Sequence, residues 1–247
     1  LNTVDSNVSA YIGNHDPVND LAAGTGEITA GGDVNVVAKA ETEVGAYSIA
    51  GALATNSSAQ TSAPADSGET QDGSSSAAGS GGTGAAKGKF GIAMSGDASL
   101  NEITANTYAY IADGVTLKQA NDVKVDASNE LDINALSGAV TVSLQAEGNG
   151  LSGSYAQNTM AGKTHAYIDN ASVSQSGDLK INSGVDGKIK TLSASVAGTK
   201  GKAGVAGSVS INKTNNETQA YLHNSSISGV NKVNVQAEDK SIIQSIA

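Results

Sequence analysis

The chain has 247 residues, of which Val, Ile, Leu and Phe supply only 48, or about 19%, close to the composition of disordered chains. Its net charge is −10, every one of its 14 basic residues is lysine, and it contains neither cysteine nor tryptophan. These features exclude disulfide frameworks, cysteine-based metal sites and thiol nucleophiles, and they predict no nucleic-acid partner because few cations could replace phosphate counterions.

A tripeptide of the form Ala-Tyr-Ile or Ala-Tyr-Leu returns four times along the chain. Its copies stand at Ala10–Ile12, Ala109–Ile111, Ala166–Ile168 and Ala220–Leu222. The spacings between them are 99, 57 and 54 residues. A fixed period of this length is typical of a repeat architecture.

Each tripeptide is followed by three further short runs, as the third unit illustrates. An alternating run comes first at Asp178–Ile181, a run of small residues follows at Leu192–Val196, and a glycine-rich run closes the unit at Gly204–Ser208. Val and Ile at alternate positions, with Gly, Asn, Asp and Ser between the runs, are typical of short strands. The sequence therefore predicts an all-β protein.

Two insertions explain the long first spacing. They fall at about 13–24 and 56–84, and the second is rich in Ser, Gly, Ala and Thr. Such a segment buries too little apolar surface to offset its ordering entropy, so we expect 56–84 to be flexible. The chain is then one continuous array, 1–247, whose successive units are 8–104 with both insertions, 105–161, 162–216 and a partial 217–247.

Repeats of 54–57 residues built from short strands predict an elongated β-solenoid, that is, a parallel β-helix. Three coils of about 19 residues per repeat would place successive tyrosines about 14 Å apart, and two larger coils per repeat are the alternative. A protruding hairpin that pairs Thr191–Ala197 with Gly204–Asn212 is a further alternative geometry.

The phrase at Gly204–Asn212, together with Thr218–Leu222, resembles the repeat units of very large bacterial surface adhesins. These are the filamentous-haemagglutinin-like and leukotoxin-like exoproteins of Gram-negative bacteria. The resemblance implies secretion to the cell surface and outer membrane, a β-helical stalk, and roles in adhesion, aggregation and virulence. It also implies a receptor or glycan on a host or neighbouring cell as partner, and it carries over no catalytic motif. Because Leu1 stands in mid-pattern, we expect the chain to be part of a longer parent.

Two glycine strings match the dinucleotide-binding fingerprint. One comprises Gly148, Gly150 and Gly153, and the other lies at 79–84. That fingerprint requires a preceding strand and a following helix, and neither string has this context. We therefore interpret both as turn glycines and expect no cofactor.

The remaining polar residues do not form a recognisable metal or catalytic pattern. The three histidines, His15, His165 and His223, fall in different units, and Asp33, Asp122 and Asp178 precede equivalent strands, where Asp commonly accepts backbone hydrogen bonds in turns. Neither a calcium repeat nor a nucleophile elbow is present. With 3% aromatic residues and no arginine, an enzyme is not expected, and a β-helical polysaccharide-active enzyme is a distant third hypothesis.

The stretch Leu192–Ile211 alternates like a membrane-inserting hairpin. Its faces, however, carry Ala, Ser and Gly, and its tip carries Lys200 and Lys202, so we expect packed solenoid strands and no membrane insertion.

Two functional hypotheses follow. The first is a structural stalk segment of a secreted adhesin, and the second is a segment that contacts a ligand or host cell through its loops. The insertion at 56–84 corresponds to the loop at 198–203, so both should project from one flank. The candidate contact residues are Asp66, Glu69, Asp72, Lys87, Lys89, Lys200 and Lys202.

Overall fold

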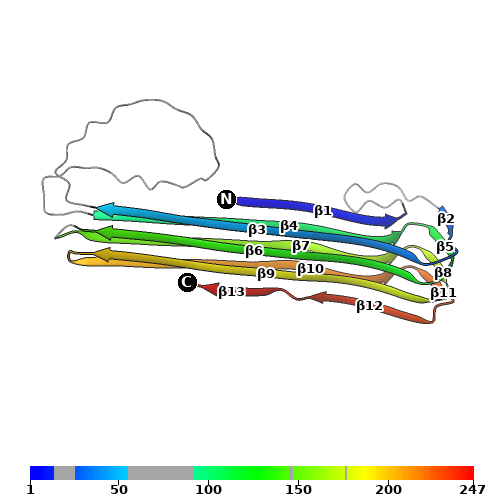
Figure 1. The fold of residues 1–247 in the computed structure, drawn as a ribbon. Coiled ribbons are helices and arrows are strands. Elements are labelled where there is room, and N and C mark those ends of the chain that lie inside the picture. The colour runs from blue at the N-terminus through cyan, green and yellow to red at the C-terminus, as the bar shows by residue number, and fades with distance from the viewer. Residues whose placement is uncertain (14–25, 55–91, 145–146, 176) are drawn as a thin grey trace, which may run out of the picture.

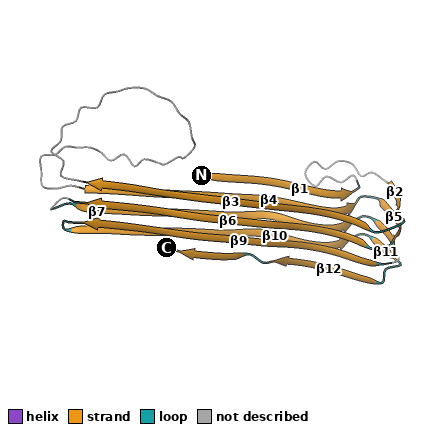
Figure 2. Ribbon diagram, viewed as in Figure 1, coloured by secondary structure: helices purple, strands orange, loops and turns teal. Residues whose placement is uncertain are grey.

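The computed structural model describes residues 1–13, 26–54, 92–144, 147–175 and 177–247. Over these ranges the chain forms strands and no helix, which confirms the all-β prediction (Figures 1 and 2). The strands are β1 (Asn2–Ile12), β2 (Gly26–Thr29), β3 (Val34–Ala54), β4 (Ile92–Ala112), β5 (Val115–Ala120), β6 (Val123–Ser143), β7 (Asn149–Asp169), β8 (Ser172–Gln175), β9 (Asp178–Thr199), β10 (Ala203–His223), β11 (Ser226–Ser228), β12 (Lys232–Asp239) and β13 (Ile242–Ile246).

The strands form three parallel sheets that together make a β-solenoid, as predicted. Two long sheets, β1-β4-β7-β10 and β3-β6-β9-β12, face each other, and the short sheet β2-β5-β8-β11 joins them at one end. In Figure 1 the short sheet lies on the right and the chain turns between the two long sheets on the left. We call these left-hand turns the arches. Each coil consists of a long strand, a short strand, a long strand and an arch.

One repeat makes one coil. Tyr110 pairs with Tyr167, which is 57 residues later, and Tyr167 pairs with Tyr221, which is 54 residues later. The rings of each pair stack with their centroids 4.9 Å apart, which is the spacing of neighbouring strands. The expectation of three coils per repeat is therefore wrong, and so is the alternative of two.

The number of coils per repeat was overestimated because the four runs predicted as separate short strands are parts of two long strands. The runs that begin at Asp178 and at Leu192 both lie in β9, and the residues between them continue the same alternation. Polar residues between the runs, such as Ser183 and Thr191, do not form turns. Their side chains are buried on the inner face of the strand.

The true corners lie at the ends of the short sheet. Asp113, Asn170 and Asn224 occupy equivalent corner positions and have φ values of 52°, 55° and 46°. Asn and Asp adopt this left-handed conformation more readily than other residues that carry a side chain. An Asp or Asn two residues after each of the last three tripeptides was thus an available signal for the short strands, which sequence reasoning missed.

No hairpin links β9 and β10. Both strands pair in parallel with their counterparts in neighbouring coils, and they face each other across the interior. Side chains bridge the gap between the sheets: Thr191 Oγ1 donates to Asn212 Oδ1 at 2.8 Å, and Ser195 Oγ donates to the Gly207 carbonyl at 2.8 Å. The hairpin alternative is therefore wrong for Thr191–Ala197 and Gly204–Asn212.

The apolar core is concentrated near the short sheet, which explains how so few large hydrophobic residues suffice. Apart from Tyr110, whose side chain is on the outer face, the largest fully buried side chains line this part of the interior and the middle of the long sheets. They are Ile103, Ile111, Leu117, Val123, Leu131, Ile133, Met160, Ile168, Leu179, Ile181 and Ile189. Towards the arches, the inner positions hold Ser, Thr, Ala and Asn instead.

Asparagines form a ladder through the middle of the interior, and the two central ones, Asn101 and Asn158, are buried. Asn2 Nδ2 donates to Asn101 Oδ1, Asn101 Nδ2 to Asn158 Oδ1, and Asn158 Nδ2 to Asn212 Oδ1, at 2.7, 2.7 and 2.8 Å. Each amide thus bridges two coils. Because a buried amide without partners would be costly, the ladder fixes the coils in register.

The molecule is a slab whose longest dimension follows its strands. A 21-residue strand spans roughly 70 Å, whereas each coil adds only about 4.8 Å along the solenoid axis. The strands of the described coils are stacked vertically in Figure 1 and run horizontally.

Candidate functional site: the outer faces of the arches

Charge is unevenly distributed along the outer faces of the two long sheets. Near the short sheet, the outward positions of β6 carry Lys124, Asp126, Glu130 and Asp132. Beyond Asn134, the outward positions of β6 carry no charge as far as Ser143. The facing sheet also lacks outward charges in the half near the arches, because the outward residues of β4 from Ile92 to Leu100 are uncharged.

Large apolar side chains occupy these uncharged halves on both faces. Tyr47 is 76% exposed on one face and Met94 is 59% exposed on the other. Register places the side chains in rows across neighbouring coils. The exposed residues on the face formed by β3, β6 and β9 are Tyr47, Ile49, Leu53, Val140, Leu192 and Val196. Those on the opposite face are Ile92, Met94, Leu100, Leu151, Val205, Val209 and Ile211.

The interior between these apolar faces is polar. Asp97 points inward and accepts hydrogen bonds from Ser137 Oγ and the Gly138 N–H, both at 2.9 Å, and from Ser48 Oγ. Ser95 and Thr141 hydroxyls bond to each other at 2.6 Å. Because these hydroxyl side chains are small, the two sheets lie close together here, and the hydroxyl groups form hydrogen bonds across the interior. The larger apolar residues of these strands therefore face outward. A contiguous exposed apolar surface of this kind is typical of a site that contacts another molecule, because monomeric proteins rarely expose large apolar patches.

The predicted contact residues are only partly described. Lys200 and Lys202 lie at the arch between β9 and β10, where the Lys200 N–H donates to the Ser143 carbonyl at 2.9 Å. They therefore lie next to the apolar faces, a juxtaposition that sequence reasoning missed. The residues Asp66, Glu69, Asp72, Lys87 and Lys89, and nearly all of the two predicted insertions, lie outside the described residues.

The recurrent aspartates are structural, as predicted. Asp33 Oδ1 accepts from the Asp122 N–H at 3.3 Å, and Asp122 Oδ1 accepts from the Asp178 N–H at 2.8 Å. Each carboxylate thus satisfies a backbone donor of the next coil.

The described histidines do not converge. His165 Nε2 lies 3.2 Å from Glu217 Oε1, whereas His223 Nδ1 lies 2.8 Å from Asp169 Oδ1. His15 lies outside the described residues. Within the described ranges, His, Asp and Glu side chains do not gather into a metal-binding group.

The dinucleotide-like glycine string lies at the start of a strand. Gly148 directly precedes β7, and Gly150 and Gly153 are within it, so the interpretation as turn glycines is wrong for the latter two. No helix follows within the described residues, and the phosphate-binding context is therefore absent there. The second string, at 79–84, lies outside the described residues.

Aromatic side chains form a column on the outer face of the sheet β1-β4-β7-β10, in the half that lies near the short sheet. Tyr11, Tyr110, Tyr167 and Tyr221 stack in turn, with ring centroids 4.9–5.1 Å apart and interplanar angles of 5° or less. Tyr108 meets the ring of His165 edge-on at 5.5 Å. The column places one tyrosine per coil and packs the outer surface of the strands.

His165 gives the fold a pH dependence. Burial lowers the pKa of its imidazole, although Glu217 opposes this effect and Lys163 adds to it. Because the folded-state pKa lies below the unfolded value, the unfolded chain binds more protons as pH falls below about 6.5, and stability decreases there. We expect the free energy of unfolding, measured by urea titration, to fall between pH 7.5 and pH 5.5. His165→Gln should reduce that fall. An equal fall in His165→Gln would contradict this assignment.

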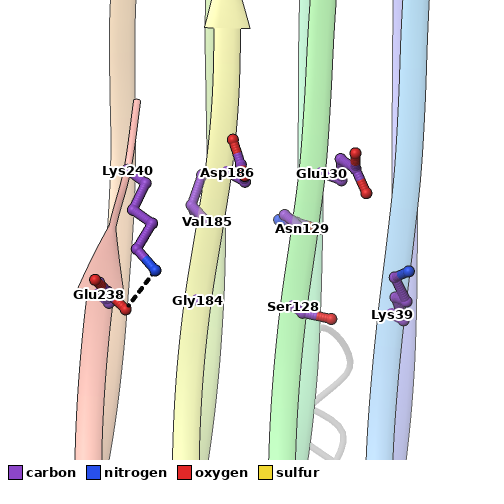
Figure 3. A pocket seen from close by; sticks show the side chains of 9 residues that line it. All are labelled: Lys39, Ser128, Asn129, Glu130, Gly184, Val185, Asp186, Glu238 and Lys240. Carbon is purple, nitrogen blue, oxygen red and sulfur yellow. Dashed lines mark ion pairs between the residues drawn. The ribbon is translucent and has the colours of Figure 1, made fainter. Parts of the chain in front are cut away.

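A shallow hollow of about 230 Å³ crosses the outer face of β3, β6, β9 and β12 (Figure 3). Its floor is low because Ser128 and Gly184 are small. Lys39 lies at one side of the hollow, and Glu238 and Lys240 lie at the other. Glu238 and Lys240 form an ion pair at 3.0 Å.

No known protein family, curated protein or solved structure matches the chain. In the described part of the chain, there is also no helix of the length and hydropathy that could cross a bilayer.

Proposed function

We propose that the chain is a structural repeat segment, or stalk, of a secreted bacterial surface adhesin that mediates attachment or aggregation. The partner would be a receptor or glycan on a host or neighbouring cell. The resemblance of Gly204–Asn212 and Thr218–Leu222 to adhesin repeats supports the class. Secretion to the cell surface belongs to the same proposal.

The observation that carries the proposal is the equivalence of successive coils. The asparagine ladder and the tyrosine column each contribute one residue per coil in the same register, and the aspartate row contributes one in each of the first three coils. Coils built in this way stack without any special partner, so a stalk can be lengthened one repeat at a time. Each repeat would extend such a stalk by only about 4.8 Å, and a long stalk would need many repeats.

Removing one repeat tests the structural role. Deletion of residues 105–161 joins Thr104 to Gly162, and the remaining strands keep their register because Thr104 pairs with Ala161. We expect far-UV circular dichroism of the shortened chain to stay β-rich and cooperative thermal unfolding to persist. Bacteria that display the shortened chain should attach to target cells as well as those that display the full chain. Loss of attachment with an intact fold would contradict a purely structural role.

The exposed apolar faces of the arches favour a second candidate, in which this segment contacts the partner itself. Leu192 and Val196 lie on one of these faces and are 44% and 59% exposed. Under this alternative, Leu192→Lys with Val196→Lys should abolish attachment without changing the thermal unfolding temperature. Deletion of 56–84 tests the loop version in the same assay. Retained attachment in both variants would favour the stalk. An enzyme acting on polysaccharide ranks third, because the described side chains form no catalytic group that supports it.

A further inference from the structure

The middle coil exposes apolar side chains on both of its outer faces. Leu151 in β7 pairs with Met94 in β4 and with Val205 in β10, so a coil lies on each side of it, yet Leu151 is 43% exposed. Val140 in β6, which lies between β3 and β9, is 44% exposed. Because these side chains point outward and already have neighbouring coils on both sides, further coils would not cover them.

We call the uncharged half of the sheet β1-β4-β7-β10 the arch face. It comprises the outward residues of β4 from Ile92 to Leu100 and the residues of β7 and β10 that pair with them. Register places its side chains in rows that cross the coils. An apolar row consists of Met94, Leu151 and Val205, and the next outward row, the glycine row, consists of Gly96, Gly153 and Gly207. A row of large side chains thus lies directly beside a row without side chains.

Among the described residues, no atom approaches the glycine row closely. A Cβ on Gly153 would lie 3.9 Å from the Gly207 carbonyl oxygen, one on Gly96 would lie 4.0 Å from the Gly153 carbonyl oxygen, and one on Gly207 would meet no atom within 4 Å. Glycine in a strand interior is destabilising relative to alanine. It often marks a place where a ligand or another backbone approaches closely. Since the described coils leave the row open, the approaching surface would belong to another molecule.

The apolar row and the glycine row make the arch face complementary to itself. A half-turn about an axis that runs between the two rows, parallel to the solenoid axis, exchanges them. Leu151 of one copy then lies over Gly153 of the other, and Gly153 of the first copy receives Leu151 of the second. The same exchange applies in the coils on either side. In such an isologous contact, each apolar row fills the glycine row of the other copy.

We propose that two copies of this chain pack side by side through the arch face, with their strands antiparallel and their solenoid axes parallel. The overlapping rows of β4, β7 and β10 carry no charged side chain. The charged halves of the two copies extend beyond the overlap on opposite sides, so these strands bring no charge into the contact. The proposal does not rest on the adhesin assignment.

The spacing of the side chains within a row identifies the occupant as a second copy. Side chains in each row repeat about every 4.8 Å, because that is the separation of neighbouring strands. A stack of parallel, in-register strands presents side chains at the same interval, and this chain is such a stack. Faces of in-register β-stacks pair in this way, with interdigitated side chains and without water between them.

The area of the contact grows with the number of coils. Ile92–Leu100 spans about 30 Å, so each coil contributes about 140 Å² and the three coils of the arch face contribute about 430 Å². A stable interface buries about 800 Å² per partner, which about six coils would supply. The chain alone should therefore dimerise weakly, whereas a longer array of the same repeat should associate more tightly.

Two matched lysine substitutions test the proposal by sedimentation velocity. We expect the chain to be monomeric at about micromolar concentration and to form dimers as the concentration approaches about 1 mM. Leu151→Lys should weaken dimerisation by about tenfold or more, because it places a charge in the apolar contact. Val140→Lys adds the same charge at a similarly exposed site on the opposite face, and it should leave the dissociation constant within about threefold. Monomers at every concentration, or equal effects of the two substitutions, would overturn the proposal.

An exchange of the large and the empty position tests the half-turn itself. Gly153→Leu should weaken dimerisation by about tenfold, because its new side chain meets Leu151 of the other copy. Leu151→Gly combined with Gly153→Leu exchanges the two positions and should restore the dissociation constant to within about threefold. Both positions face outward, so far-UV circular dichroism and urea unfolding should show an intact fold in each variant. A folded double variant that dimerises as weakly as Gly153→Leu would show that the two rows do not meet.

Discussion

Gly162→Ala should destabilise the fold by about 2–4 kcal/mol, measured as the free energy of unfolding in urea. Gly162 lies in β7, where a Cβ would fall 1.9 Å from the Ala105 carbonyl oxygen and 2.8 Å from its carbon. These are backbone atoms of the neighbouring coil, so no rotamer change can relieve the contact. The alanine must separate β7 from β4 locally and weaken the parallel ladder.

The irregular pairing at this point explains why the strands approach so closely. The register between β4 and β7 is interrupted between Thr104 and Thr107. There the Asn106 side chain, through Oδ1, accepts from the Lys163 N–H at 3.0 Å. A side chain thus satisfies a backbone donor next to Gly162, and the Ala105 carbonyl lies against the glycine. Only a residue without a side chain fits this position.

Gly153→Ala is the matched control because it makes the same change on the same strand. Gly153 faces outward, and a Cβ there would meet no atom closer than the Gly207 carbonyl oxygen at 3.9 Å. We expect no loss of stability, and a gain of up to about 1 kcal/mol from reduced freedom of the unfolded chain. If both alanine variants unfolded at the same urea concentration, the close contact at Gly162 would not constrain the fold.

The fold class was predictable because alternation identifies strands, and the tripeptide spacing identifies the repeat. The number of coils per repeat was not predictable from the same signals. A side-chain period of two continues unchanged through a strand of any length, so it cannot separate two short strands from one long one. Ser and Asn are typical of turns, but Ser183 and Asn129 are buried members of strands, and their side chains bond across the interior. The turn chemistry that mattered was at Asp113 and Asn170.

The apolar outer faces could not be predicted for a related reason. In Leu192–Val196, alternation places the leucine and valine on one side and Ser193 and Ser195 on the other. Hydrophobicity alone assigns the leucine to the core, yet the structure buries Ser193 and exposes Leu192. A strand shifted by one residue would show the opposite face inward, so only the partners across the interior decide. Here Ser154 Oγ lies 2.9 Å from Ser193 Oγ, which fixes the serine side as the inner one.

Asn158→Leu tests whether buried hydrogen bonding holds the coils in register. Asn158 is fully buried, and its Nδ2 donates to Thr191 Oγ1 and Asn212 Oδ1, both at 2.8 Å. Leucine has a similar volume, so the change removes hydrogen bonds without leaving a large cavity. Asn101 Nδ2 loses its 2.7 Å bond to Asn158, and its remaining bond, to Ser99 Oγ, is 3.1 Å. We expect a loss of about 2–4 kcal/mol in the free energy of unfolding.

An exposed asparagine provides the control for this change. Asn134 lies on the outer face of β6, where its amide reaches Glu43 Oε1 at 3.4 Å. Asn134→Leu should change the free energy of unfolding by less than about 0.5 kcal/mol. Asn101→Leu combined with Asn158→Leu should cost less than the sum of the single changes, because the two residues share one hydrogen bond. Additive losses would mean that the asparagines act separately. If Asn158→Leu were as stable as the wild type, the asparagine ladder would not hold the coils in register, and the backbone hydrogen bonds and the tyrosine column would do so alone.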